Sequence, residues 1–198
     1  MKILFVSYHY WPPHFGGELK ISIERFEALT QRGHTVTVFT SGVPGLPGQE
    51  QNNGIFIMRS PLIHDSRWGR GIRRLLFPLW VIWHAGQLSF DILHFGSIGG
   101  IDPISHCLGM LLIILMAKKK KAKTVFVHSL ADTEEEMFSN KGFRRRIRNI
   151  WLKKMDAIVS VSPALHQGVS KFHQDRSRLI VYGVRDGIFK IPDPSERE

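Results

Sequence analysis

The sequence has one cysteine, few acidic residues and no apolar run long enough to cross a membrane. Cys107 alone excludes an intramolecular disulfide and favours a reducing compartment. It lies in an apolar helical pattern, which indicates a buried small side chain rather than a nucleophile. The apolar stretch that includes Leu108 to Met116 spans about twelve residues in all, short of the ~20 that a membrane-spanning helix needs. No signal peptide is expected, because Lys2 leads directly into a short apolar strand.

Positive charge is in excess, with 27 Lys and Arg against 17 Asp and Glu and a net charge of +10. Such a field attracts anions: nucleic acid, phosphorylated ligands or an anionic membrane surface. Nucleic acid is not an expected partner, because the sequence has no recognition helix, zinc site or RNA-binding signature. With 198 residues, 43% of them hydrophobic, the chain is long enough to form a globular core. We expect a cytoplasmic protein, with peripheral contact at the inner face of the membrane.

The first part of the chain predicts a βαβ unit. Lys2 to Val6 is an apolar run of strand length, typical of a strand buried on both faces of a parallel sheet. Gly16 and Gly17 then open a helix that ends at Gly33, and Val36 to Phe39 supplies the next strand. The N-terminus of a helix favours an anion, and glycines let a phosphate approach the backbone. A tight turn alone would also explain the two glycines.

Strands and helices alternate along the rest of the chain. The segment from Ser41 to Asn53 is expected to be an exposed loop bordering a site. A helix is predicted from Asp102 to about Ala117, buried between the sheet and a neighbour, and another that begins at Pro163. About seven strands and five helices predict one Rossmann-like, doubly wound parallel sheet with helices on both faces. The further predicted strands are 55–58, 91–95, 124–127, 156–162 and 179–182.

Two arginine-rich stretches allow two interpretations each. Arg67 to Arg74 precede a run of Leu, Phe and Trp, which suits either a membrane interface or an ordinary core helix. Arg144 to Arg148 belong to a basic amphipathic helix that either lies on anionic lipid or is solvated on one side. Its apolar face is predicted to hold Ile147, Ile150, Trp151 and Met155. The lysines of 118–121 are interpreted as a solvated run at a helix C-terminus.

The ordered set of motifs resembles a retaining glycosyltransferase with the GT-B fold, of the family 4 or group 1 type related to mannosyl- and sucrose-phosphate-type transferases. The first strand, its proline-containing loop and Gly16-Gly17 look like the start of that family. The later strands follow in the family's order. Gly183-Val184 with Phe189 is similar to its closing Asn-Gly-Val-Asp signature, except that Tyr182 and Arg185 replace Asn and Asp.

The resemblance implies roles for individual residues. Gly16 and Gly17 would approach the donor diphosphate, and His128, at the end of a central strand, would be the catalytic residue near the donor sugar. The acceptor site would include Tyr8, Tyr10, His14 and His94. The family uses a nucleotide-sugar as donor, a saccharide or lipid-linked molecule as acceptor, and neither a cofactor nor a metal.

The same resemblance predicts the domain organisation. Residues 1–190 would form the N-terminal, acceptor-binding domain, and 191–198 a linker or tail. The donor-binding domain, which in the family carries two glutamates seven residues apart, is not in this sequence and would be supplied in cis or in trans. The alternative is a stand-alone module that binds a saccharide or lipid-linked acceptor and catalyses nothing.

Overall fold

The computed structural model describes residues 1–10, 17–61, 67–96, 104–128 and 143–181. Their strands form one eight-stranded sheet in the order β3-β4-β2-β1-β5-β6-β7-β8, in which every neighbouring pair is parallel except the antiparallel pair β3 and β4. The strands are β1 Lys2–Val6, β2 Thr35–Ser41, β3 Gln49–Asn52, β4 Ile55–Ser60, β5 Ile92–Phe95, β6 Lys123–His128, β7 Ala157–Ser160 and β8 Ser177–Leu179.

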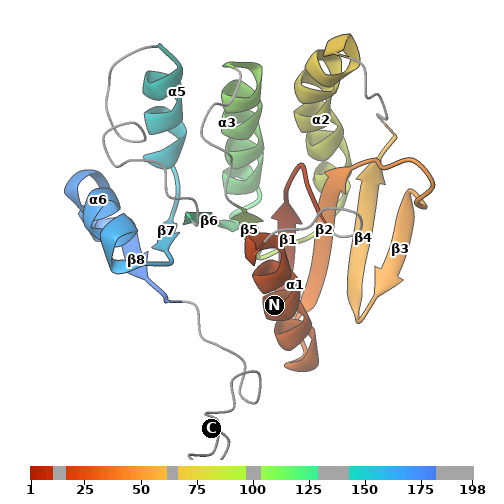
Figure 1. The fold of residues 1–198 in the computed structure, drawn as a ribbon, viewed down its shortest axis with the longest axis horizontal. Helices are drawn as coiled ribbons and strands as arrows, with labels where there is room; N and C mark the ends of the chain where they lie inside the picture. Colours follow the sequence, from red (N-terminus) through yellow and green to blue (C-terminus); the bar gives the residue numbers. More distant parts are fainter. Residues whose placement is uncertain (11–16, 62–66, 97–103, 129–142, 182–198) are drawn as a thin grey trace, which may run out of the picture.

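Helices cover both faces of this sheet, and the two faces have separate apolar cores. The helices are α1 Gly17–Gln31, α2 Arg67–Gln87, α3 Ile104–Lys119, α5 Phe143–Leu152 and α6 Pro163–His173. On one face, Phe26 of α1 packs with Phe5 and the inward residues of β2 and β4. On the other face, α2, α3, α5 and Val169 of α6 share a larger core. Figure 1 shows α2, α3 and α5 standing side by side. None of the described helices is long and apolar enough to cross a membrane.

The sheet has eight strands where the sequence predicted about seven, and the additional strand is β3. Strand β3 lies inside the segment from Ser41 to Asn53, which the sequence predicted to be a loop, and it pairs with β4 through a two-residue turn. Asn53 and Gly54 both have positive φ, 48° and 80°. That is the backbone of a type I′ hairpin, for which Asn-Gly is the strongest short signal. The strand is polar because it lies at the edge of the sheet and has no core face of its own.

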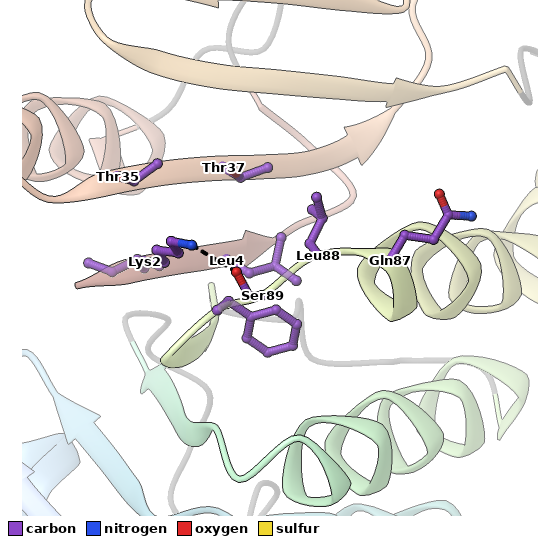
Figure 2. A pocket seen from close by; sticks show the side chains of 9 residues that line it. Lys2, Leu4, Thr35, Thr37, Gln87, Leu88 and Ser89 are labelled. Atoms are coloured by element: carbon purple, nitrogen blue, oxygen red, sulfur yellow. Dashed lines mark hydrogen bonds between the residues drawn. The ribbon is translucent and has the colours of Figure 1, made fainter.

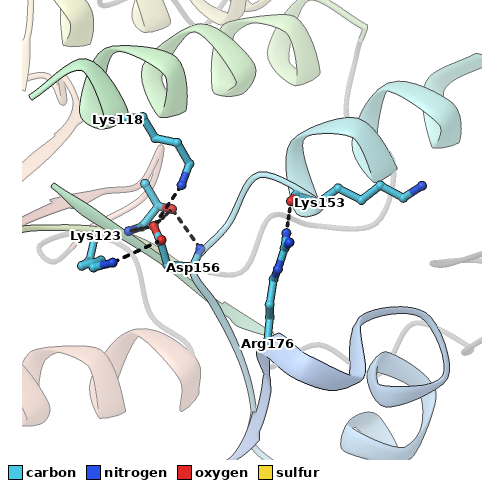
Figure 3. A network of polar contacts seen from close by, with 6 residues as sticks. Lys118, Lys123, Lys153, Asp156 and Arg176 are labelled. Carbon is cyan, nitrogen blue, oxygen red and sulfur yellow. Dashed lines mark hydrogen bonds and ion pairs between the residues drawn. The ribbon is translucent and has the colours of Figure 1, made fainter. Parts of the chain in front are cut away.

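Asp156 joins β7 to β6 at the amino ends of the strands (Figure 3). Its Oδ2 accepts hydrogen bonds from the N–H and Oγ1 of Thr124, at 2.9 and 2.7 Å, and its own N–H donates to Thr124 Oγ1 at 3.1 Å. Lys118 Nζ reaches the same carboxylate at 3.2 Å. Lys120 Nζ donates to the carbonyls of Gly86 and Leu88. Two of the four lysines predicted to be solvated therefore hold elements together.

Other boundaries differ from the predictions in detail. The last strand ends at Leu179, where a strand over 179–182 was expected. Among the residues described there, which end at 181, the N–H of Ile180 extends the pairing by donating to the carbonyl of Ser160. In α5 the predicted apolar face is wrong: Trp151 is buried and Ile150 is exposed, because adjacent residues are about 100° apart around a helix. The start of α6 is confirmed, with Pro163 in its first turn and Ser162 Oγ accepting from the N–H of Leu165.

Candidate functional site

The connections of the sheet diverge between β1 and β5. From β1 the chain runs through α1 to β2 on one side, and from β4 it returns through α2 to β5 on the other side of β1. Val6 and Phe95 pair at the carboxyl ends of these two strands. In open α/β sheets, ligands bind outside the carboxyl ends at such a divergence. The candidate site is therefore built from the residues that follow β1 and β5.

Gly96 follows β5 at this point and lies against Phe5 of β1. A Cβ added to Gly96 would stand 2.9 Å from Cζ and 3.2 Å from Cε2 of that ring. A residue with a side chain would push the ring, which is itself fully buried. The absence of a side chain at Gly96 thus lets the two strand ends approach each other.

The segment after β1 is fixed to β2 by its backbone. The N–H of Ser7 donates to the carbonyl of Phe39 at 3.0 Å. The carbonyl of Tyr8 accepts from Ser41 Oγ at 2.5 Å and from Thr40 Oγ1 at 3.3 Å. Ser7 Oγ donates to the carbonyl of His9 at 2.8 Å. The beginning of the loop predicted to shape the acceptor site is therefore held by the sheet itself.

The two tyrosines of this segment point to opposite faces of the sheet. The ring of Tyr8 packs on Phe77 of α2, with the centroids 4.4 Å apart. The ring of Tyr10 is buried on the α1 face with its edge toward Phe5. Burial, reinforced by the negative charge of Glu27 and opposed by Arg59, raises the pKa of Tyr10 well above its usual value. Its hydroxyl is consequently a neutral hydrogen-bond donor across the physiological pH range.

His94 lies in the same aromatic cluster as Tyr10. Its ring stacks on Phe5 at 5.1 Å and meets Phe26 edge-on at 5.6 Å, and the residue is only 7% exposed. Burial, and secondarily the positive charge of Arg25, hold the pKa of His94 well below its usual value. The ring is therefore neutral. Direct contact between His94 and an acceptor would require this packing to open.

The remaining predicted site residues are described only in part. Helix α1 begins at Gly17, as the sequence predicted, and His128 is the last residue of β6, paired in register with Ser160 of β7. His128 lies at the carboxyl edge of the sheet because it ends a parallel strand. Gly17 lies at the same edge because α1 runs antiparallel to β1. The side chain of His128 lies outside the described part, as do Gly16 and His14. Their proposed roles stay predictions.

Sequence reasoning missed a buried arginine near this edge. Arg59, next to the end of β4, forms a salt bridge with Glu50 of β3 at 2.7 Å, and its Nη1 donates to the carbonyl of Pro47 at 3.1 Å. Ser60 and Ser160 end β4 and β7 with buried hydroxyls that have no partner among the described residues. The signal was available in the sequence: an Arg-Ser pair ending an otherwise apolar strand is unexpected in a buried position.

A cavity of about 340 Å³ lies at the opposite edge of the sheet. Figure 2 shows that its lining comes from the start of β1, from β2, and from the end of α2 and the segment that follows it. Lys2 Nζ donates to Ser89 Oγ there at 2.8 Å. It is far from the carboxyl ends, so it does not form part of the candidate site. Among the residues described, no group of His, Cys, Asp and Glu could hold a metal ion.

Comparison with known proteins places this geometry in a family. The model of the family described as Glycosyltransferase Family 4 matches residues 23–185. Among solved structures, the crystal structure of Anabaena Alr3699/HepE in complex with UDP is similar, with a TM-score of 0.52 and 14% sequence identity. The match covers 93% of this chain and 44% of that one, so the chain spans less than half the length of HepE. A comparison with the curated proteins finds no match.

These findings confirm the predicted fold class. A single, mostly parallel sheet flanked by helices, matched over nearly the whole chain to under half of HepE, corresponds to one half of a GT-B fold. The family match covers most of the chain, from within α1 to beyond β8. The chain therefore belongs to glycosyltransferase family 4.

Proposed function

We propose that this chain is the acceptor-binding half of a retaining glycosyltransferase, which moves a sugar from a nucleotide-sugar to a saccharide or lipid-linked acceptor. The observation that carries the proposal is the family match over residues 23–185. Those residues form most of a sheet whose connections diverge between β1 and β5. The UDP bound in the HepE structure supports a nucleotide-sugar as donor. The second half of the GT-B fold would bind the nucleotide, in cis or in trans.

In this proposal the carboxyl edge provides three functions. The N-terminus of α1 at Gly17, with Gly16 before it, meets the donor diphosphate with backbone N–H groups and the positive end of the helix dipole. His128, at the end of β6, lies beside the donor sugar. The segment from Ser7 onward, including Tyr8 and His14, borders the acceptor.

Tyr10 and His94 take a more specific role than direct acceptor contact. Both rings contact Phe5, and Gly96, which follows β5, lies against the same Phe5 ring. We assign them the positioning of the acceptor loop, because buried rings define where that loop leaves the sheet. A neutral His94 also adds no positive charge beneath a neutral saccharide.

The test is transfer by the full-length protein or by this chain combined with its donor-binding partner. UDP-sugars and GDP-sugars would be offered with saccharide and polyprenyl-phosphate acceptors, and the anomeric configuration of the product would be read by NMR. A product with the configuration of the donor supports the proposal. An inverted product contradicts the retaining mechanism. Saccharide binding by this chain alone, without transfer in any combination, would establish the binding-module alternative.

A further inference from the structure

The helix layer formed by α2, α3 and α5 has an apolar outer surface. In α2, Phe77 and Val81 face the sheet, while Leu79 and Trp83, on the opposite side of the helix, are 53% and 69% exposed. Helix α3 was predicted to be buried between the sheet and a neighbour, but its outward residues are exposed, Leu112 by 47%. The exposed apolar residues of the layer are Leu76, Leu79, Trp83, Leu108, Leu112, Leu115 and Ile150. We call this set the outer apolar face.

These residues form one face because their helices are neighbours. Helix α3 packs against α2 on one side and α5 on the other, as Figure 1 shows. In α3, Leu108, Leu112 and Leu115 are spaced four and three residues apart, so they form one stripe along the helix. Isolated exposed apolar residues are common, but a contiguous patch of this kind on a protein surface marks an interaction site.

The charge of the same layer has a single sign. Helices α2, α3 and α5 contain no Asp or Glu, whereas α1 on the other face of the sheet contains three Glu. Four Arg lie in α2, two Lys in α3 and four Arg in α5. Arg146 is exposed and one helical turn from the outward-facing Ile150. At the C-terminal ends of α3 and α5, Lys119 and Lys154 are exposed.

We propose that the outer apolar face docks on an anionic lipid bilayer, with its leucines and Trp83 entering the interface and the exposed Arg146, Lys119 and Lys154 contacting lipid phosphates. Charge identifies the occupant. In a symmetric dimer each copy presents the same patch, so a second copy would bring these cationic helices against themselves. An anionic bilayer would bury the apolar side chains in its interface and attract the basic residues to its phosphates. The inference does not depend on the transfer reaction proposed above.

The experiment is vesicle flotation of the full-length protein, with phosphatidylcholine vesicles and with vesicles that also contain phosphatidylglycerol. We expect binding to the anionic vesicles, weakened by salt because the Debye length shortens. The double variant Leu79→Gln/Leu112→Gln should lower the partition coefficient at least about tenfold, since each leucine loses much of its transfer free energy. Arg146→Glu with Lys119→Glu should reduce binding to anionic vesicles only.

Ile180→Gln is the matched control, because Ile180 is 58% exposed but lies after β8, outside the three helices. It should bind vesicles like the wild type. Thermal melts would confirm that all variants are folded. Three results would overturn the proposal: no binding to either vesicle, equal loss of binding in Ile180→Gln, or a wild-type dimer that Leu79→Gln/Leu112→Gln converts to monomer. The last result would show that a second copy covers the face.

Discussion

Gly109 of α3 lies directly against Pro78 of α2. A Cβ added to Gly109 would stand 2.3 Å from Pro78 Cγ and 2.5 Å from its Cβ, closer than atoms can approach. Pro78 lies inside α2, where it lacks the N–H that would complete the helix ladder. The two helices can pack at this distance only because one contributes no side chain at the contact. The contact also sets the spacing of the helix layer that carries the outer apolar face.

Gly109→Ala should therefore destabilise the protein by about 1–3 kcal/mol, although alanine favours helix more than glycine does. Equilibrium denaturation measures the change. Gly86→Ala is the control, because Gly86 is also in a helix and its added Cβ would meet nothing within 4 Å. Pro78→Ala should recover only part of the loss in the Gly109→Ala background, because it removes the Cγ of Pro78 but keeps its Cβ. If Gly109→Ala is as stable as the wild type, the helices do not pack this closely.

His94 predicts that the protein loses stability as the solution becomes mildly acidic. Burial and Arg25 lower the pKa of His94 in the folded protein, whereas in the unfolded chain it titrates near 6.5. The unfolded state therefore binds a proton first as the pH falls. This residue consequently leaves the free energy of unfolding unchanged above about pH 6.5 and lowers it below that pH, by up to ~1.4 kcal/mol per pH unit. The decline ends once the folded ring is itself protonated.

Urea denaturation between pH 7.5 and 5 measures this slope. His94→Phe keeps an aromatic ring on Phe5 and removes the titration, so its free energy of unfolding should depend less on pH than that of the wild type. The other histidines are present in both proteins and cancel in the difference. Equal slopes for the two proteins would show that His94 is not the titrating group.

Asp156 predicts a second effect at lower pH. Its partial burial raises the carboxyl pKa, but the hydrogen bonds from Thr124 and the charge of Lys118 outweigh burial and leave the pKa below its usual value. Stabilisation by this carboxylate is present above the unfolded value of about 3.8 and is lost as the pH falls through the folded pKa. Asp156→Asn should cost about 1–3 kcal/mol at pH 7.

The difference between Asp156→Asn and the wild type should shrink as the pH falls below about 4, and it should disappear once the carboxyl of the folded protein is itself protonated. Thr124→Val in the Asp156→Asn background should add less destabilisation than it does alone, because the two residues share their hydrogen bonds. Additive effects in that double-mutant cycle would mean that the contact contributes nothing measurable.

The buried pair of Arg59 and Glu50 predicts a larger loss of stability. Glu50→Gln removes the counter-charge of a guanidinium that is almost fully buried, so it should destabilise by about 3–5 kcal/mol. Replacing both partners, as Arg59→Met/Glu50→Gln, should recover much of this loss. Lys123→Met breaks an exposed ion pair with Asp156 and serves as the control, with a change of at most about 1 kcal/mol. Similar losses from Glu50→Gln and Lys123→Met would place Arg59 in contact with water.

The order of strands and helices could be predicted because buried parallel strands are continuous apolar runs, as Lys2 to Val6 shows. The predictions failed where exposure and pattern disagree. Strand β3 is polar because it lies at the edge of the sheet, and the Asn53-Gly54 turn is the local sequence signal that indicates it. Helix α3 is apolar all round, a pattern that normally indicates burial, yet one side is exposed.

The candidate site was predictable in position but not in contacts. Strand ends mark the carboxyl edge, so His128 and Gly17 could be placed there from the sequence. Which way Tyr8 and Tyr10 point depends on the cores of the two faces, and no local pattern encodes that. The burial of His94 likewise depends on Phe26, which comes from a distant helix.

His128→Ala tests the proposed transfer site directly. The residue ends β6 at the carboxyl edge, where a side chain beside the donor sugar would act on the reacting atoms. Removing it should lower kcat/KM of the complete enzyme about 100-fold or more, the usual effect of losing a positioned catalytic group. His34→Ala is the control: His34 lies at the amino edge, next to the N-terminus of the chain, and its loss should leave kcat/KM unchanged. Thermal melts distinguish a catalytic loss from unfolding. Loss of a purely structural histidine would lower the melting temperature rather than the turnover. If His128→Ala keeps full transfer activity, His128 does not belong to the proposed site.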